Sequence, residues 1–205
     1  MRFLYNSSLL TKEQIKLLSK SILHYIDDMS LTAKNNNYTT NESSINLPFD
    51  KKILEEVKQL KEKKVSSKLK YIIDIGIGGS NLGTKAVYDA KFGFFDLIQP
   101  ARFAKMIFAD TNDPEYLSKL STFLKTEIQD PEEILICAIS KSGSTTETIV
   151  NFEIIQNLLS QKFGNISERI VVITDFESFF WKKAHEKGIS TLAVPKIVGG
   201  RYSVM

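Results

Sequence analysis

The chain has 205 residues, 42% of them hydrophobic, and a formal net charge of +3 from 27 basic and 24 acidic residues. Because the lysines are spread along the chain and form no patch, we expect no nucleic-acid partner. Cys137 is the single cysteine, which excludes an intramolecular disulfide or a cysteine-rich metal site and fits a reducing cytoplasm. Since no run of about 18 apolar residues and no signal-peptide core appears, the sequence favours a soluble cytoplasmic protein with no membrane partner.

Residues 1–64 are predicted to form an N-terminal helical segment that contains a polar loop. Thr11 is the expected N-cap of a helix over residues 11–29, whose apolar face would carry Ile15, Leu18, Ile22, Tyr25 and Ile26. The stretch from Ser30 to Asp50 is rich in Asn, Ser and Thr and predicts a loop. A charged amphipathic helix is then expected over residues 50–64.

Residues 65–205 are predicted to form an α/β domain. Five short apolar runs cover residues 71–76, 104–110, 134–140, 169–175 and 190–195. Helix-length segments separate them, at roughly residues 81–91, 113–124, 145–162 and 177–187. Continuous apolar strands that alternate with amphipathic helices indicate a parallel sheet covered on both faces. The expected fold is therefore a doubly wound, five-stranded, three-layer α/β sheet of the flavodoxin-like or Rossmann-like kind.

The first candidate site segment is "DIGIGGSNLG", residues 74–83, at the carboxyl end of the first expected strand. Its glycines, among them Gly79, allow a tight turn and a close approach of the backbone to a ligand, and Ser80 could cap the helix that follows. A dinucleotide-binding loop is a weaker interpretation, because the acidic ribose ligand is expected about 20 residues later and Asp110 lies about 30 residues on. A purely structural strand-to-helix turn is the remaining alternative.

The second segment is "SKSGSTTET", residues 140–148, at the carboxyl end of the third expected strand. Six hydroxyl side chains lie here beside the free amides at the start of the next helix, and together they form an anion site that suits a phosphate monoester. A Walker loop is excluded because its sequence pattern is absent. The alternative is a hydroxyl-rich helix cap with Glu147 or Glu153 offsetting the helix dipole.

The third segment is "VGGRYSVM", residues 198–205. Gly199 and Gly200 would let Arg201 turn toward the same rim of the sheet, although a surface arginine in a turn is also compatible with the pattern. The sequence stops in this glycine-rich loop and apolar run, so we expect it to be a fragment of a longer chain. No cluster of His, Cys, Asp or Glu has metal-ligand spacing, and no metal is expected.

In this order, the three segments resemble successive motifs of the glucose-6-phosphate isomerase family, within the sugar isomerase (SIS) superfamily. The resemblance implies substrate binding by Gly79, Ser80 and Gly200 and by a phosphate loop formed by Ser140, Lys141, Ser142, Gly143, Ser144 and Thr145. It implies that Arg201 is catalytic and stabilises the charge of the enediolate. The implied reaction interconverts glucose 6-phosphate and fructose 6-phosphate through a cis-enediol, without a cofactor.

The chain departs from the family in one respect. The proton-transferring glutamate, the ring-opening histidine and a late lysine of the family belong to segments after the arginine motif. We therefore expect an N-terminal portion that stops before a second SIS domain and has no turnover alone, with a homodimer as the full-length form. A non-catalytic SIS module that binds sugar phosphates and a Rossmann dehydrogenase are the competing interpretations.

Overall fold

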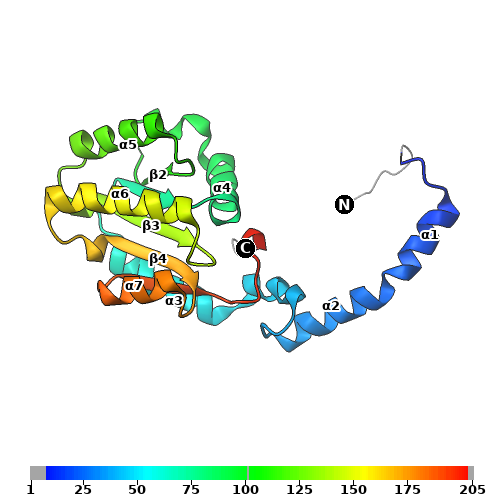
Figure 1. Ribbon diagram of the computed structural model, residues 1–205. Helices are drawn as coiled ribbons and strands as arrows, with labels where there is room; N and C mark the ends of the chain where they lie inside the picture. The colour runs from blue at the N-terminus through cyan, green and yellow to red at the C-terminus, as the bar shows by residue number, and fades with distance from the viewer. Residues whose placement is uncertain (1–7, 101, 203–205) are drawn as a thin grey trace.

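The computed structural model describes residues 8–100 and 102–202, and its body is a five-stranded, all-parallel sheet between helices (Figure 1). The strands are β1 (Tyr71–Ile75), β2 (Lys105–Phe108), β3 (Ile134–Ser140), β4 (Ile170–Asp175) and β5 (Ser190–Val194). Their spatial order, β2-β1-β3-β4-β5, is the flavodoxin-like order, with its switch point between β1 and β3. The predicted doubly wound parallel sheet is confirmed.

The central strands are apolar up to their carboxyl ends, because both of their faces are covered. Ile73 of β1 lies opposite Ile136 of β3, which lies opposite Ile170 of β4, and all three are fully buried. The neighbouring residues Leu135 and Val171 point to the other face, where they form a second, smaller core. Burial on both faces removes the alternation of polar and apolar residues that a half-exposed strand would show.

Helices cover both faces of the sheet and complete three layers. They are α3 (Lys51–Lys64), α4 (Leu82–Phe92), α5 (Pro114–Glu127), α6 (Thr146–Phe163) and α7 (Phe179–Glu186). The larger core takes Leu124 from α5, Leu159 from α6 and Phe180 from α7. On the other face α3 packs Leu60 against the smaller core, and the Lys64 ammonium pairs with Glu168 at 3.1 Å.

Short 3-10 helices make several of the connections: η1 (Asn41–Phe49), η2 (Gly78–Ser80), η3 (Phe94–Ile98), η4 (Pro131–Glu133), η5 (Ser167–Arg169) and η6 (Gly200–Tyr202). The edge strand β2 is linked to η3 through Lys105. This lysine is buried, and its ammonium donates to the carbonyl of Leu97 at 2.9 Å. A charged side chain of this kind disfavours pairing with another strand.

The N-terminal prediction is partly wrong. Thr11 is the N-cap, with a capping box to Gln14, but the single helix expected over residues 11–29 is two helices, α1 (Lys12–Ser21) and α2 (Leu23–Asn35), which meet at Ile22. Its apolar face is not buried: Ile22 is 51% exposed and Ile26 46%. Figure 1 shows α1 and α2 extending away from the sheet.

The loop expected from Ser30 to Asp50 is also wrong, since α2 continues to Asn35 and η1 follows. Asn36 ends α2 with a positive φ of 46°. The buried amide of Asn46 then donates to the carbonyls of Thr32 at 3.3 Å and Asn37 at 2.9 Å, which orders the polar segment. The division into residues 1–64 and 65–205 stays a prediction. Within the described ranges, no helix combines the length and apolar character that crossing a membrane requires.

Replacing Leu159 by Ala should lower the free energy of unfolding by about 2–5 kcal/mol, because this fully buried side chain would leave a cavity in the larger core. Urea denaturation measures the change, and the slope of the transition should stay constant. Leu17→Ala on α1, at a side chain that is 71% exposed, is the control and should change stability by less than about 0.5 kcal/mol. Equal losses in the two variants would contradict the described core.

Candidate functional site

The three sequence segments follow β1, β3 and β5, so they lie at one edge of the sheet. Parallel strands place all their carboxyl ends at the same edge, and ligands of open α/β sheets bind there, near the switch point. The first two segments flank the switch point itself, because β1 and β3 are neighbours. The third continues from β5 to η6, which Figure 1 shows in red on the side toward which the β3 arrow points.

Hydrogen bonds among hydroxyls shape the loop of residues 140–145. The buried Ser140 hydroxyl donates to the Thr145 hydroxyl at 3.0 Å and accepts from the Thr145 amide at 3.4 Å. The Ser144 hydroxyl donates to that of Ser142, also at 3.0 Å. The Gly143 amide donates to the carbonyl of Ser140 at 3.0 Å, which closes the turn.

Thr145 is the N-cap residue of α6, yet its side chain makes no capping hydrogen bond. The amides of the first helical turn have no carbonyl partner within the helix, so an absent cap leaves them able to bind an anion. This geometry disfavours the alternative in which the hydroxyls serve only as a helix cap. Ser140 and Thr145 bind each other, while Ser142 and Ser144 lie on the exposed part of the turn.

Gly143 is required by its surroundings. Its φ is +67°, a conformation that residues with a Cβ rarely adopt. A Cβ built at this position would lie 2.4 Å from the Ser178 hydroxyl. That hydroxyl caps α7 by accepting from the Trp181 amide at 3.1 Å. The loop therefore packs directly on the turn between β4 and α7.

Gly79 brings the first and third segments into contact. A Cβ on Gly79 would lie 2.5 Å from both the Arg201 nitrogen and the Gly200 carbonyl carbon, so only glycine allows the two backbones to approach this closely. Gly200 also faces the second segment, since its Cβ position lies 3.9 Å from the Lys141 Cβ. The predicted site residues from all three segments are thus gathered in one place.

Ser80 and Arg201 need separate description. Ser80 lies in η2 and does not cap the next helix; Asn81 is the N-cap of α4, so that expectation is wrong. The Arg201 side chain is exposed and makes no hydrogen bond or ion pair with any described residue. A guanidinium in this state keeps all five of its donors for a ligand.

Lys141 differs from the other predicted residues because the protein already binds its ammonium. The Nζ atom lies 3.1 Å from Asp175 Oδ2 and donates to the carbonyl of Lys196 at 2.6 Å. Sequence reasoning missed Asp175, although it is the last residue of an expected strand and so belongs to the same edge.

Two further buried polar residues at this edge were also missed. Asn81 is 1% exposed, and neither its oxygen nor its nitrogen has a hydrogen-bond partner among the described residues. Asp74, near the end of β1, is equally buried and has an unpaired Oδ1. Burial and the nearby negative charge of Asp110 raise the pKa of Asp74 to about 7. Asp110, weighed above as a ribose ligand, pairs with Lys85 at 3.0 Å.

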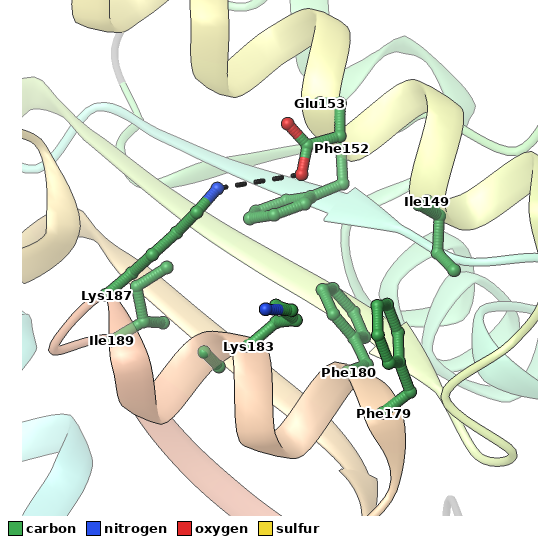
Figure 2. Close-up of a pocket in the computed structure, with 9 residues that line it drawn as sticks. Ile149, Phe152, Glu153, Phe179, Phe180, Lys183, Lys187 and Ile189 are labelled. Atoms are coloured by element: carbon green, nitrogen blue, oxygen red, sulfur yellow. Dashed lines mark ion pairs between the residues drawn. The ribbon is translucent and has the colours of Figure 1, made fainter.

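A small cavity of about 170 Å³ lies between α6 and α7 (Figure 2). Its lining includes Ile149, Phe152, Phe179, Phe180 and Ile189, and it includes none of the predicted site residues. Its charged rim is already paired, Lys187 with Glu153 at 3.7 Å and Lys183 with Glu186 at 2.7 Å. Within the described part of the chain, no group of three His, Cys, Asp or Glu residues is placed to hold a metal.

The family model described as phosphoglucose isomerase matches residues 19–205. The chain belongs to this family. It is 34% identical over 163 residues to a glucose-6-phosphate isomerase from Rubrobacter xylanophilus, and the match covers 78% of this chain and 37% of that protein. The chain therefore spans a little over a third of the length of this relative.

Two solved structures have a similar fold, and one of them is titled a glucose-6-phosphate isomerase. A hypothetical protein from Thermus thermophilus matches with a TM-score of 0.68 and 27% identity, over 91% of this chain and 43% of that one. A glucose-6-phosphate isomerase from Chlamydia trachomatis matches with a TM-score of 0.60 and 25% identity, over 79% of this chain and 29% of that one. Neither comparison favours the non-catalytic alternative.

The raised pKa of Asp74 predicts a specific dependence of stability on pH. Between pH 4 and pH 7 (its usual pKa is 3.8) the folded protein keeps the proton that the unfolded chain releases, so stability falls as pH rises through this window. Asp74→Asn removes this cost and should raise the free energy of unfolding at pH 8 by on the order of 4 kcal/mol. The gain should vanish near pH 4.

Thermal or urea unfolding at several pH values measures the effect. Asp28→Asn, at an exposed aspartate of α2, is the matched control and should show no such trend. A gain for Asp74→Asn that stays constant between pH 4 and pH 8 would contradict a proton held by the buried carboxyl.

Proposed function

We propose that this chain is the sugar-phosphate-binding part of a glucose-6-phosphate isomerase, which interconverts glucose 6-phosphate and fructose 6-phosphate through a cis-enediol. One observation carries the proposal: the uncapped start of α6 lies among the hydroxyls of residues 140–145, beside the segment that holds Arg201. Membership of the family and the names of the relatives support the same function.

The phosphate of the substrate is proposed to bind at residues 140–145. Its three terminal oxygens accept hydrogen bonds, which the exposed hydroxyls of Ser142 and Ser144 and the first amides of α6 can donate. The positive end of the α6 dipole adds to the attraction. Gly79, Ser80 and Gly200 are proposed to contact the sugar, as the family resemblance implies; Gly79 meets the backbone of Gly200 and Arg201, and Gly200 faces Lys141 of the loop.

Arg201 is proposed to act on the charge that develops during the reaction. Removal of the proton from C2 of glucose 6-phosphate gives an enediolate, whose oxygen carries a negative charge that the sugar lacks. A guanidinium fixed near that oxygen stabilises the transition state more than the ground state, which is the condition for catalysis. Its close backbone contact with Gly79 supports such a fixed position.

The remaining groups of the reaction are assigned by family resemblance alone. The glutamate that moves the proton, the histidine that opens the ring and the late lysine match no segment of these 205 residues. We propose that they belong to the part of the relatives that this chain does not cover. The same resemblance supports a cytoplasmic homodimer as the complete enzyme.

Glucose 6-phosphate should protect the chain from thermal unfolding, whereas glucose should not, because the anion site recognises the phosphate. At a concentration a hundredfold above the dissociation constant, the stabilisation should be about 2.7 kcal/mol. Ser142→Ala should weaken this protection, with Thr122→Ala on α5 as the control that leaves it intact. Equal protection by the two sugars would rule out a phosphate site.

The 205 residues alone should show no measurable isomerase turnover. A positioned general acid or base typically contributes about 10²–10⁴-fold to the rate, and the family's groups are missing from this sequence. A coupled assay that follows glucose 6-phosphate formation from fructose 6-phosphate provides the measurement. Rates typical of an intact enzyme would refute the assignment of the proton-transfer groups to other segments.

A further inference from the structure

Lys141 is the only charged residue in the loop of residues 140–145, and its ammonium turns toward the protein. Its Nζ atom lies 3.1 Å from Asp175 Oδ2, and the two side chains are only 26% and 15% exposed. The same nitrogen donates to the carbonyl of Lys196 at 2.6 Å. An ammonium has three donors, so at most one is left for a ligand.

A backbone hydrogen bond also joins Lys141, which follows β3, to Asp175 at the end of β4. The Asp175 amide donates to the carbonyl of Lys141 at 2.9 Å, so the two residues bind each other through both main chain and side chain. Asp175 ends β4 and its Oδ1 atom is buried without a partner among the described residues. The position of Lys141 is therefore set by the sheet and does not depend on a bound anion.

Lys196 belongs to the segment that leads to Arg201. In this segment the Val198 amide donates to the carbonyl of Pro195 at 2.9 Å, and the Val198 side chain is fully buried. The backbone then passes directly over Gly79 at Gly200 and Arg201. Lys141 thus joins the phosphate loop to the segment that carries the proposed catalytic arginine.

We propose that Lys141 is a positioning residue, which holds residues 195–201 and hence Arg201 in place through its bonds to Asp175 and to the carbonyl of Lys196. This role rests on the proposed function and changes the one assigned to Lys141 by resemblance, where it contacts the substrate. Phosphate affinity then comes from neutral donors, and the lysine acts on the arginine end of the substrate.

The first test needs no ligand. Lys141→Met keeps the length of the side chain and removes its charge, and Asp175→Asn removes the charge of the partner while leaving Lys141 intact. Both variants should increase hydrogen exchange of the Val198 amide at least roughly tenfold, the scale for losing a charge-assisted hydrogen bond, with the amides of β3 unchanged. Lys58→Met, at an exposed lysine of α3, is the control. Unchanged exchange in both variants would overturn the proposal.

The second test compares two probes, inorganic phosphate and an aldonic acid phosphate whose carboxylate stands in place of the charged enediolate. Lys141→Met should weaken binding of the acid phosphate roughly tenfold and of inorganic phosphate less than about twofold. Arg201→Ala should give the same pattern, and the double variant should lose little more than either single one, because both act through Arg201. Asp175→Asn should weaken binding of the acid phosphate alone.

Equal weakening of both probes by Lys141→Met, with no effect of Asp175→Asn, would show that Lys141 is a direct phosphate ligand and would overturn the proposal. The two tests also separate this proposal from the proposed function. If neither probe binds the unaltered chain but exchange at Val198 increases in both variants, the positioning role of Lys141 holds for the segment and the sugar-phosphate site is wrong.

Discussion

The close approach of two backbones at Gly79 is the constraint on which the site depends. Gly200 and Arg201 lie where the Cβ of any other residue at position 79 would be, so the chain after β5 can reach the loop after β1 only across a glycine. In the sheet, β3 and β4 separate these two strands. The contact therefore joins the segments after β1 and β5 across the carboxyl edge. The loop of residues 140–145, which is proposed to bind phosphate, follows β3, a strand that lies between those two in the sheet.

Buried polar atoms without a partner in the described part of the chain also lie at the carboxyl edge of the sheet. The faces of the sheet are apolar, whereas the buried polar side-chain atoms that lack a partner among the described residues include those of Asp74, Asn81 and Asp175, which lie near the carboxyl ends of strands. A buried polar atom without a partner costs about 1–3 kcal/mol, so a fold selected only for stability would have few of them. These atoms lie at the carboxyl edge, which is the edge where ligands of open α/β sheets bind.

Sequence patterns predicted the sheet well because its signals are local. Each observed strand falls inside the apolar run that predicted it, and α5 and α6 begin within a residue or two of their expected starts. The loop prediction for the N-terminal segment was wrong because the interactions that order this segment are not local. The side-chain amide of Asn46 donates to backbone carbonyls 9 and 14 residues away. Residue propensities alone assign such an asparagine to a turn or loop.

In the candidate site, too, the features encoded by adjacent residues could be predicted from the sequence, and the long-range contacts could not. Glycine and hydroxyl patterns identified the three segments, since turns and helix starts are encoded by adjacent residues. The pairing of Lys141 with Asp175 spans two strands and could not be found without the register of β3 and β4. The family resemblance alone implied that Lys141 is a ligand, while the structure shows its ammonium held by the protein.

In the proposed site, different groups recognise the permanent charge of the phosphate and the transient charge of the enediolate. A phosphate carries its charge throughout the reaction, so binding it more tightly lowers the energies of substrate and transition state alike and does not speed the chemical step. Neutral hydroxyls and amides at the start of α6, the proposed phosphate site, suit that task, because such donors can hold an anion without a cation that would need its own counter-charge. In the proposed reaction the enediolate charge appears only transiently, and Arg201, exposed and unpaired among the described residues, is the cation proposed to meet it. In the proposed positioning role, the charge of Lys141 holds residues 195–201, which carry Arg201, beside the loop of residues 140–145.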